Sequence, residues 1–130
     1  MAQFGFHHIH LRTPDPEATA AFYEKMFGAE VIRQTQQGKP RVDVKLAGGA
    51  MIFLLPSAPG EAAEAPKAPN FGIDHFGLGV TGIDALAKDL KAKGAHFTVE
   101  PYDIRPGTRI AFLRGPESVL IELVDTSGGK

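Results

Sequence analysis

Three histidines within four positions are the most chemically capable groups near the start of the chain, in "FHHIHLRT" at residues 6–13. The stretch alternates and is rich in branched and aromatic residues, which is typical of a strand. Because successive side chains of a strand point to opposite faces, His8 and His10 share one face, whereas His7 goes with Ile9. A neutral imidazole can bind a divalent metal or transfer a proton near neutral pH. This strand therefore offers two candidate groups on one face.

An internal repeat distinguishes the histidines further. Residues 6–31 resemble residues 73–97, and the overlay places His8 on His75 and His7 on Asp74. Two equivalent positions thus carry histidine. Both rings could be satisfied by backbone carbonyls, or both could be metal ligands. The sequence "AMIFLLP" at 50–56 overlays "VLIELVD" at 119–125 in the same way, which places Phe53 on Glu122.

Glu122 lies inside an apolar strand-like run, and burying a charge is costly unless it is paired or bound to a metal. An arginine such as Arg109 or Arg114 could pair with Glu122, or Glu122 could lie on an edge strand with its carboxylate exposed to solvent. Alternatively, His8, His75 and Glu122 meet at a metal. Two imidazoles and one carboxylate form the set used for Fe(II), which also fits Mn(II) or Zn(II) and leaves coordination positions open.

Two copies of one module must position these groups. We predict an α+β fold of two βαβββ modules, at about 5–56 and 73–126, with a linker at 57–72, in a single domain over 1–130. Sheet faces left exposed by each module would enclose a cleft. Asp15 is expected to cap the first helix, with an apolar stripe at Ala18, Phe22 and Met26. The second helix has its stripe at Ile83, Leu86, Ala87 and Leu90, with Gly94 past its end. The remaining strands are predicted at 29–36, 41–47, 50–56, 96–104, 108–114 and 118–125.

Composition narrows the classes of function. The 130 residues are 43% apolar and 22% charged, with a net charge of −1 and no cysteine. Disulfides, thiol catalysis and cysteine zinc sites are excluded. Without a basic block or a long apolar run, we expect neither nucleic acid nor a membrane as a partner. The start of the chain lacks the features of a secretory signal, so a cytoplasmic location is expected.

Three motifs carry a resemblance to a known family: "HHIHLRTPDPEATAAFYEKMFG", "IDHFGLGV" and "IAFLRGPESVLIELVD". Over about residues 5–126 the chain resembles the vicinal oxygen chelate superfamily. That superfamily holds glyoxalase I, methylmalonyl-CoA epimerases, extradiol dioxygenases, fosfomycin transferases and bleomycin-sequestering proteins. The resemblance implies paired βαβββ modules around a metal cleft, with His8, His75 and Glu122 as ligands. It also implies a homodimer, in which modules sometimes pair across chains.

The fourth ligand position departs from the glyoxalase pattern, because Phe53 stands where those enzymes usually carry glutamate. Without that carboxylate, proton transfer next to a carbonyl would lack a partner base. We therefore expect a metal-dependent enzyme of dioxygenase type, acting on a small chelating oxygenated substrate. Fe(II) or Mn(II) is favoured, and Zn(II) or Ni(II) is possible. The alternatives are a glyoxalase I-like lyase or isomerase, a fosfomycin-type transferase, and a non-catalytic drug-sequestering protein.

Further residues complete the predicted site. His10 is expected to handle protons or only to line the pocket. Tyr102 is a second candidate for proton transfer, or a wall residue. Phe53 and Phe112 are expected to make the cleft apolar for a flat organic ligand, and Arg105 is expected to meet an anionic group of the substrate.

Overall fold

The computed structural model describes residues 2–61 and 64–128. The chain divides into two compact units, residues 1–63 and 64–130. In each unit the order is strand, helix, strand, strand, strand, and the strands form one four-stranded mixed sheet. The predicted α+β class with two βαβββ modules is confirmed. No helix or strand is assigned over the described part of the 57–72 segment.

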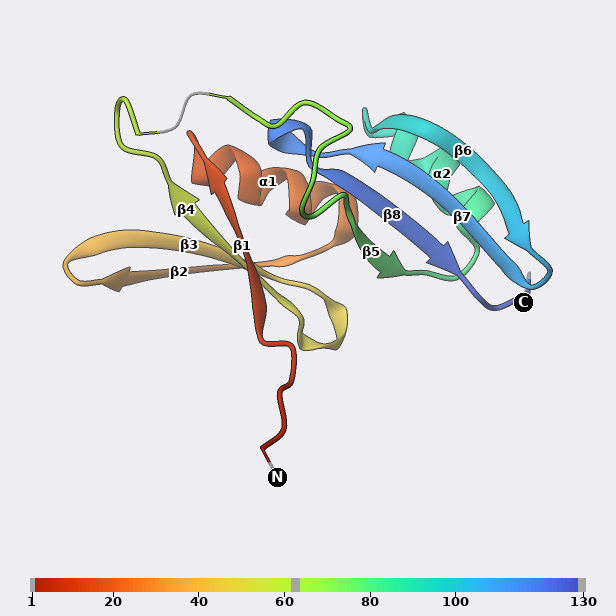
Figure 1. Cartoon of the computed structure of the whole chain (residues 1–130), viewed down its shortest axis with the longest axis horizontal. Coiled ribbons are helices and arrows are strands. Elements are labelled where there is room, and N and C mark those ends of the chain that lie inside the picture. Colours follow the sequence, from red (N-terminus) through yellow and green to blue (C-terminus); the bar gives the residue numbers. More distant parts are fainter. Residues whose placement is uncertain (1, 62–63, 129–130) are drawn as a thin grey trace. The chain divides into compact units, whose positions relative to one another are not determined.

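The first unit has its strands in the order β1-β4-β3-β2 (Figure 1). The outer strand β1 runs parallel to β4, and the other neighbours are antiparallel. Helix α1 packs on one face of this sheet, against β2, β3 and β4. The elements are β1 (His8–Thr13), α1 (Pro16–Phe27), β2 (Glu30–Gln36), β3 (Lys39–Lys45) and β4 (Met51–Pro56), with a short 3-10 turn at Ala47–Gly49.

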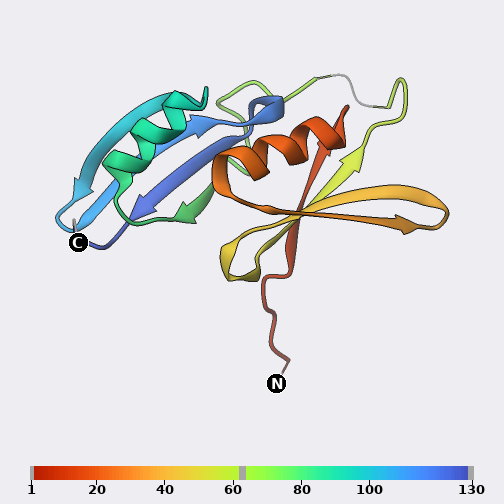
Figure 2. The ribbon, with the colours of Figure 1, turned by 180° about the vertical axis from the view of Figure 1, so that it is seen from behind.

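The second unit repeats this topology with the order β5-β8-β7-β6. Strand β5 is parallel to β8, and α2 contacts β6, β7 and β8, as the view from behind shows (Figure 2). No helix in the described residues is long and apolar enough to cross a membrane. The elements are β5 (Phe76–Gly79), α2 (Ile83–Ala92), β6 (His96–Arg105), β7 (Thr108–Arg114) and β8 (Leu120–Asp125), with a 3-10 turn at Pro116–Ser118.

Helix α1 begins and ends at the predicted signals, but its buried stripe differs by one position. The Asp15 side chain accepts a hydrogen bond from the Ala18 amide at 3.1 Å, and Gly28 ends the helix in the left-handed region at φ 67°. Ala18 is exposed, so its predicted place in the apolar stripe is wrong. The buried side chains of α1 are Thr19, Ala20, Tyr23 and Met26, so of the predicted stripe only Met26 is fully buried.

Alternation along the strands separates a helix-covered face from a second face. Beneath α1 the buried residues are Val42, Val44, Ile52 and Leu54, and beneath α2 they are Ala111, Leu113, Ile121 and Leu123. Ile9 pairs in register with Ile52, so it lies on the helix side of its sheet. His8 and His10 therefore point away from α1, as predicted. By the same alternation, Phe112 and Glu122 point away from α2.

Candidate metal centre

In the first unit, His8 lies among aromatic rings on the face of β1 and β4 away from the helix. Its ring stacks on Phe53 with centroids 4.1 Å apart and an interplanar angle of 27°. His10 meets the edge of the same ring at 5.5 Å. The His7 and His8 Nδ1 atoms are 2.8 Å apart. In the tautomer in which His8 donates from Nδ1, its Nε2 lone pair is left for a metal.

The pairing register supports the equivalence of the two halves. On the parallel strands, His10 pairs with Phe53, and Gly77 pairs with Glu122. His8 is two residues before His10, as His75 is two residues before Gly77. The structural overlay is therefore the one predicted from the repeat. It also shows that the second unit has glycine where the first has His10.

In the second unit, His75 lies between two carboxylates just before β5. Its Nε2 is 3.0 Å from Oε1 of Glu122 on β8, and its Nδ1 is 2.7 Å from Oδ2 of Asp74. Both ring nitrogens can donate only when the imidazole is protonated. The hydrogen bond to Asp74 thus raises the pKa of His75; partial burial opposes this, and the bond to Glu122 adds to the rise. The Phe112 ring meets His75 edge-on at 5.1 Å.

The 3.0 Å separation of the His75 and Glu122 atoms fits two ligands of one metal ion. Neighbouring ligands about 2.1 Å from an ion and at right angles lie roughly 3.0 Å apart. The Glu122 side chain is 18% exposed and the His75 side chain 32% exposed, so the pair is partly shielded yet reachable. Asp74 would hold the other ring nitrogen, as carboxylates commonly do for metal-bound histidines.

The predicted metal ligands are divided between the units, since His8 is in the first and His75 and Glu122 are in the second. Over residues 2–61 and 64–128, no group of three or more metal-binding side chains is assembled. The His8, His75, Glu122 set consequently remains a prediction. We call His8 in the first unit and the His75–Glu122 pair in the second unit the two half-sites.

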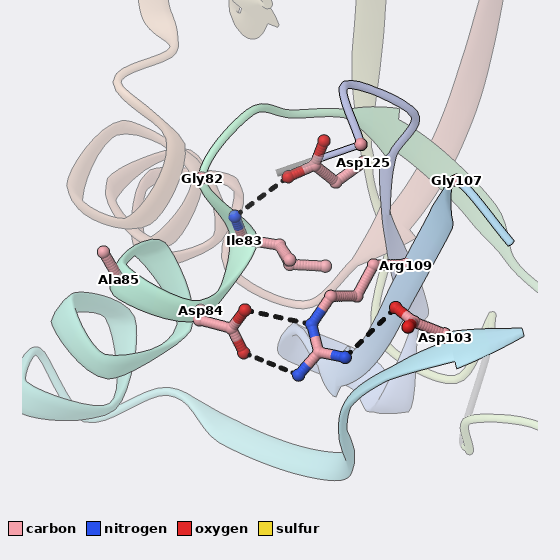
Figure 3. Close-up of a pocket in the computed structure, with 9 residues that line it drawn as sticks. Gly82, Ile83, Asp84, Ala85, Asp103, Gly107, Arg109 and Asp125 are labelled. Atoms are coloured by element: carbon pink, nitrogen blue, oxygen red, sulfur yellow. Dashed lines mark hydrogen bonds and ion pairs between the residues drawn. The ribbon is translucent and has the colours of Figure 1, made fainter. Parts of the chain in front are cut away.

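Neither arginine considered as a partner of Glu122 pairs with it. Arg109 donates to both Asp84 carboxylate oxygens at 2.9 Å, and to Asp103 at 3.2 Å (Figure 3). Arg114 donates to the backbone carbonyl of Ser118 at 2.8 Å. Glu122 instead meets His75.

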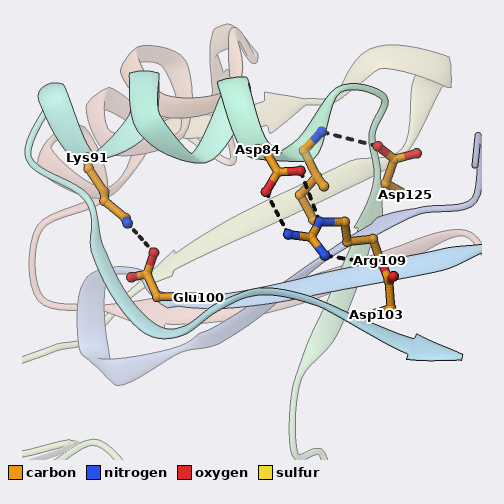
Figure 4. Close-up of polar contacts among 7 residues, drawn as sticks. Asp84, Lys91, Glu100, Asp103, Arg109 and Asp125 are labelled. Atoms are coloured by element: carbon orange, nitrogen blue, oxygen red, sulfur yellow. Dashed lines mark hydrogen bonds and ion pairs between the residues drawn. The ribbon is translucent and has the colours of Figure 1, made fainter. Parts of the chain in front are cut away.

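The cavity of about 450 Å³ beside Arg109 has a structural explanation. Arg109 on β7 joins Asp84 in the first turn of α2 to Asp103 on β6, and Asp125 accepts from the Ile83 amide at 3.1 Å (Figure 4). The charged groups that face this cavity are thus occupied in fixing α2 to its sheet.

The other predicted site residues of the second unit lie at different distances along the sheet. Phe112 pairs with Glu122, so it is directly beside the half-site. Tyr102 is 45% exposed and pairs with Ile110, two residues from Phe112. Arg105 pairs with Thr108, four residues from Phe112, which is about 13 Å along the strand. Roles for Tyr102 and Arg105 in a reaction remain predictions.

Two functional candidates were missed by the sequence reasoning: Asp74 and Asp43. Asp74 was seen only as the counterpart of His7, although its place next to a candidate ligand was a usable signal. Asp43 is 1% exposed, and its Oδ2 accepts from Arg41 Nε at 2.7 Å. Nothing local in "KPRVDVK" indicates that the carboxylate is buried, because this depends on the partner strand.

The fold and the two half-sites define an α+β protein of paired βαβββ modules. A family model described as the Glyoxalase/Bleomycin resistance protein/Dioxygenase superfamily matches residues 5–123. The chain belongs to this superfamily, which is the vicinal oxygen chelate superfamily that the motifs resemble.

Individual relatives agree with this assignment. YwkD of Bacillus subtilis strain 168 is 30% identical over 124 residues, covering 92% of this chain and 94% of that protein. The lactoylglutathione lyase of Haemophilus influenzae strain Rd is 28% identical over 133 residues, covering 95% and 93%. A glyoxylase/bleomycin resistance protein/dioxygenase domain from Frankia sp. EAN1pec has the same fold, with a TM-score of 0.76, 21% identity, and coverage of 95% and 98%.

Proposed function

We propose that this protein is a metal-dependent enzyme whose His8, His75 and Glu122 side chains bind one divalent ion. The substrate is a small oxygenated organic molecule that chelates the ion. The observation that carries the proposal is the His75–Glu122 pair, whose nitrogen and oxygen are 3.0 Å apart. His8 is the repeat equivalent of His75 and completes the set from the other module, within one chain or from a second copy.

The three-ligand set favours dioxygenase-type chemistry with Fe(II) or Mn(II). A bound ion of this kind polarises the oxygens of a chelating substrate and leaves positions for a second molecule. His10, on the face of His8, is the candidate for proton transfer. Partial desolvation lowers the pKa of His10, and the positive charge of Arg41 lowers it further. The imidazole is therefore neutral at pH 7 and able to accept a proton.

A lyase of the lactoylglutathione type is the second candidate, favoured by the name of the Haemophilus influenzae relative. The difficulty lies at Phe53. This ring stacks on His8 and pairs in register with His10, at the position equivalent to Glu122. A phenyl ring offers neither a metal ligand nor a base, so Glu122 would be the only carboxylate from these paired strand positions. For this reaction, Zn(II) or Ni(II) would be the possible metal ions.

Metal analysis of protein purified without a histidine tag tests the proposal. We expect close to one ion per chain, and its loss in His75→Ala and Glu122→Gln. Asp89→Asn is the matched control, since Asp89 is an exposed acid of the same unit that pairs with Lys93 at 3.1 Å. The proposal fails if the wild-type chain retains no Fe(II), Mn(II), Zn(II) or Ni(II) after reconstitution and dialysis.

Two assays on the metal-loaded protein separate the reactions. Oxygen uptake with a panel of catechols is expected for the dioxygenase, with loss in Glu122→Gln. Conversion of the hemithioacetal of methylglyoxal and glutathione would instead establish the lyase. A protein that binds a metal but neither consumes oxygen nor converts the hemithioacetal would refute both reactions.

Pairing with a second copy of the chain belongs to the same proposal. Several large apolar side chains are exposed at the N-terminal segment and before β5, among them Phe4, Phe6, Phe71 and Ile73. Where exposed apolar side chains form a contiguous patch, they often mark a protein–protein interface. Light scattering coupled to gel filtration is expected to give twice the chain mass of 13.9 kDa. A monomer at micromolar concentration would refute the dimer.

A further inference from the structure

The two units differ in how far their central strands stay paired. In the second unit β7 and β8 are in register over six positions, from Arg109–Asp125 to Arg114–Leu120. In the first unit the equivalent strands β3 and β4 pair at only three positions, the last being Asp43 with Phe53. Beyond this point β4 continues beside β1 alone. The sheet of the first unit therefore opens between β3 and β4.

The Asp43 side chain marks the point where the pairing stops. Its Oδ1 accepts a hydrogen bond from the Leu54 amide at 3.1 Å, in place of a backbone acceptor from β3. Its Oδ2 accepts from Arg41 Nε at 2.7 Å. A carboxylate that is 1% exposed is tolerated because both oxygens are bonded, one of them to a cation. Asp43 thus links the backbone of β4 to the side chain of Arg41 on β3.

Arg41 is held in one orientation with part of its hydrogen-bonding capacity unused. Its guanidinium carbon lies 4.6 Å from the centroid of the Phe53 ring, and Nη1 also donates to Gln36. A guanidinium has five N–H donors, and these contacts use one on Nε and one on Nη1. The remaining donors lie on the planar Nη1 and Nη2 fork, the geometry that matches a carboxylate. With its side chain 21% exposed, Arg41 is also partly desolvated.

A groove of about 830 Å³ runs along this opening, within the first unit. That volume is in the range of small-molecule sites. Arg41 and Lys39 contribute positive charge, while Leu54, Leu55 and Pro40 contribute apolar wall. Among the described residues, Lys39 has no ion-pair partner within 4.0 Å.

The acidic side chains that line the groove are already engaged. Glu61 pairs with Arg12, and Glu17 pairs with Arg33 at 2.7 Å. Asp15 caps α1 through the Ala18 amide. These carboxylates are therefore engaged with other groups, which reduces their competition with an anion for the unused donors of the groove.

We propose that Arg41 binds the carboxylate of a flat organic acid in this groove. The groove is connected to His8 through its neighbours, because His10 lines the groove and the Phe53 ring that supports Arg41 also stacks on His8 and meets His10. The side chain that replaces the fourth ligand would then position an anionic substrate. As a statement about the substrate, this rests on the proposed function. As a statement about anion binding, it holds for the metal-free protein as well.

Benzoate and its neutral analogue benzamide are the probes, titrated into the metal-free full-length protein at low ionic strength and followed by amide NMR shifts. We expect benzoate to shift groove residues and to bind at least tenfold more tightly than benzamide. Arg41→Gln should reduce benzoate affinity on the order of tenfold or more and leave benzamide unchanged. Arg114→Gln is the matched control, because Arg114 lies in the second unit, outside the groove, and donates to the backbone carbonyl of Ser118.

Arg41→Lys serves as the second variant should Arg41→Gln not fold, since lysine keeps the charge beside Asp43 but lacks the planar fork. It should lose several-fold in benzoate affinity. Benzoate binding that is equal in wild type and Arg41→Lys, or equal to benzamide binding, would overturn the proposal.

Failure of this inference differs from failure of the proposed function. A chain that binds a divalent ion through His75 and Glu122 but shows no Arg41-dependent benzoate binding keeps the metal centre and loses the anion site. A chain that binds benzoate through Arg41 but retains no metal keeps the anion site and loses the metalloenzyme.

Discussion

Replacing Asp74 by asparagine is the most direct perturbation of the candidate metal centre that leaves every predicted ligand in place. The Asp74 carboxylate accepts from His75 Nδ1 at 2.7 Å, while His75 Nε2 faces Glu122. Asparagine keeps the size and a hydrogen-bonding oxygen but removes the charge. The substitution therefore tests whether Asp74 orients and polarises a metal-bound imidazole.

The expected magnitude follows from the type and exposure of this contact. Loss of a carboxylate that supports a metal-bound histidine typically lowers metal affinity by about 10- to 100-fold. The Asp74 side chain is 64% exposed, so solvent screens its charge. We therefore expect the lower end, about tenfold, at pH 8.

The ratio between the two proteins should shrink as the pH falls. Asp74 raises the pKa of His75, so the wild-type imidazole is more protonated near pH 6 than the variant imidazole. Metal binding must displace the Nε2 proton, which costs the wild-type protein more than the variant under these conditions. In the variant, the loss of the Asp74 charge weakens metal binding, whereas the lower degree of His75 protonation favours it. At low pH these two effects on metal affinity partly cancel.

Isothermal titration of the metal-free protein with Mn(II) or Zn(II) at pH 6, 7 and 8 measures this ratio. Asp89→Asn is again the control, and its affinity should match that of wild type. Less than a twofold change in Asp74→Asn at pH 8, or a ratio that grows as the pH falls, would refute the reasoning.

Three further predictions concern the metal-free protein. In NMR titrations His10 should titrate below 6.5 and His75 above it. Stability from His75 should be present below its unfolded pKa and lost as the pH rises through its folded value, whereas His10 should destabilise the fold as the pH falls below 6.5; the opposite order of titration would contradict both assignments. Tyr23 is buried and its hydroxyl has no partner among the described residues, so Tyr23→Phe should raise the free energy of unfolding by about 1 kcal/mol in urea; a loss of 1 kcal/mol would reveal an unseen partner for the hydroxyl. Asp43→Ala should lower the free energy of unfolding by about 3 kcal/mol, because it leaves the Leu54 amide and the Arg41 guanidinium without their partner. A decrease below about 1 kcal/mol would argue against Asp43 as the link between β3 and β4.

The elements and their faces could be predicted from the sequence because they depend on local patterns. Strand alternation separates His8 and His10 from Ile9, the Asp15 cap marks the start of α1, and Gly94 follows the end of α2, although the buried face of α1 was misplaced at Ala18. The strand predicted at 108–114 is β7, Thr108–Arg114. The repeat identified His75 and Glu122 as candidate ligands. The fold brings these two side chains, 47 positions apart in the sequence, into contact.

Which partner each charged side chain takes was decided only by the tertiary structure. Arg109 was considered as an ion-pair partner of Glu122. Strand alternation instead puts Arg109 on the α2 face of its sheet, where it donates hydrogen bonds to Asp84 and Asp103. The Asp43–Arg41–Phe53 group exists because β3 and β4 separate at one position, a matter of long-range register with no local signal. The sequence by itself determined the modules, the faces and the candidate ligands. Ion pairs and the groove depend on side chains brought together from different strands and helices, and only the folded chain sets those distances.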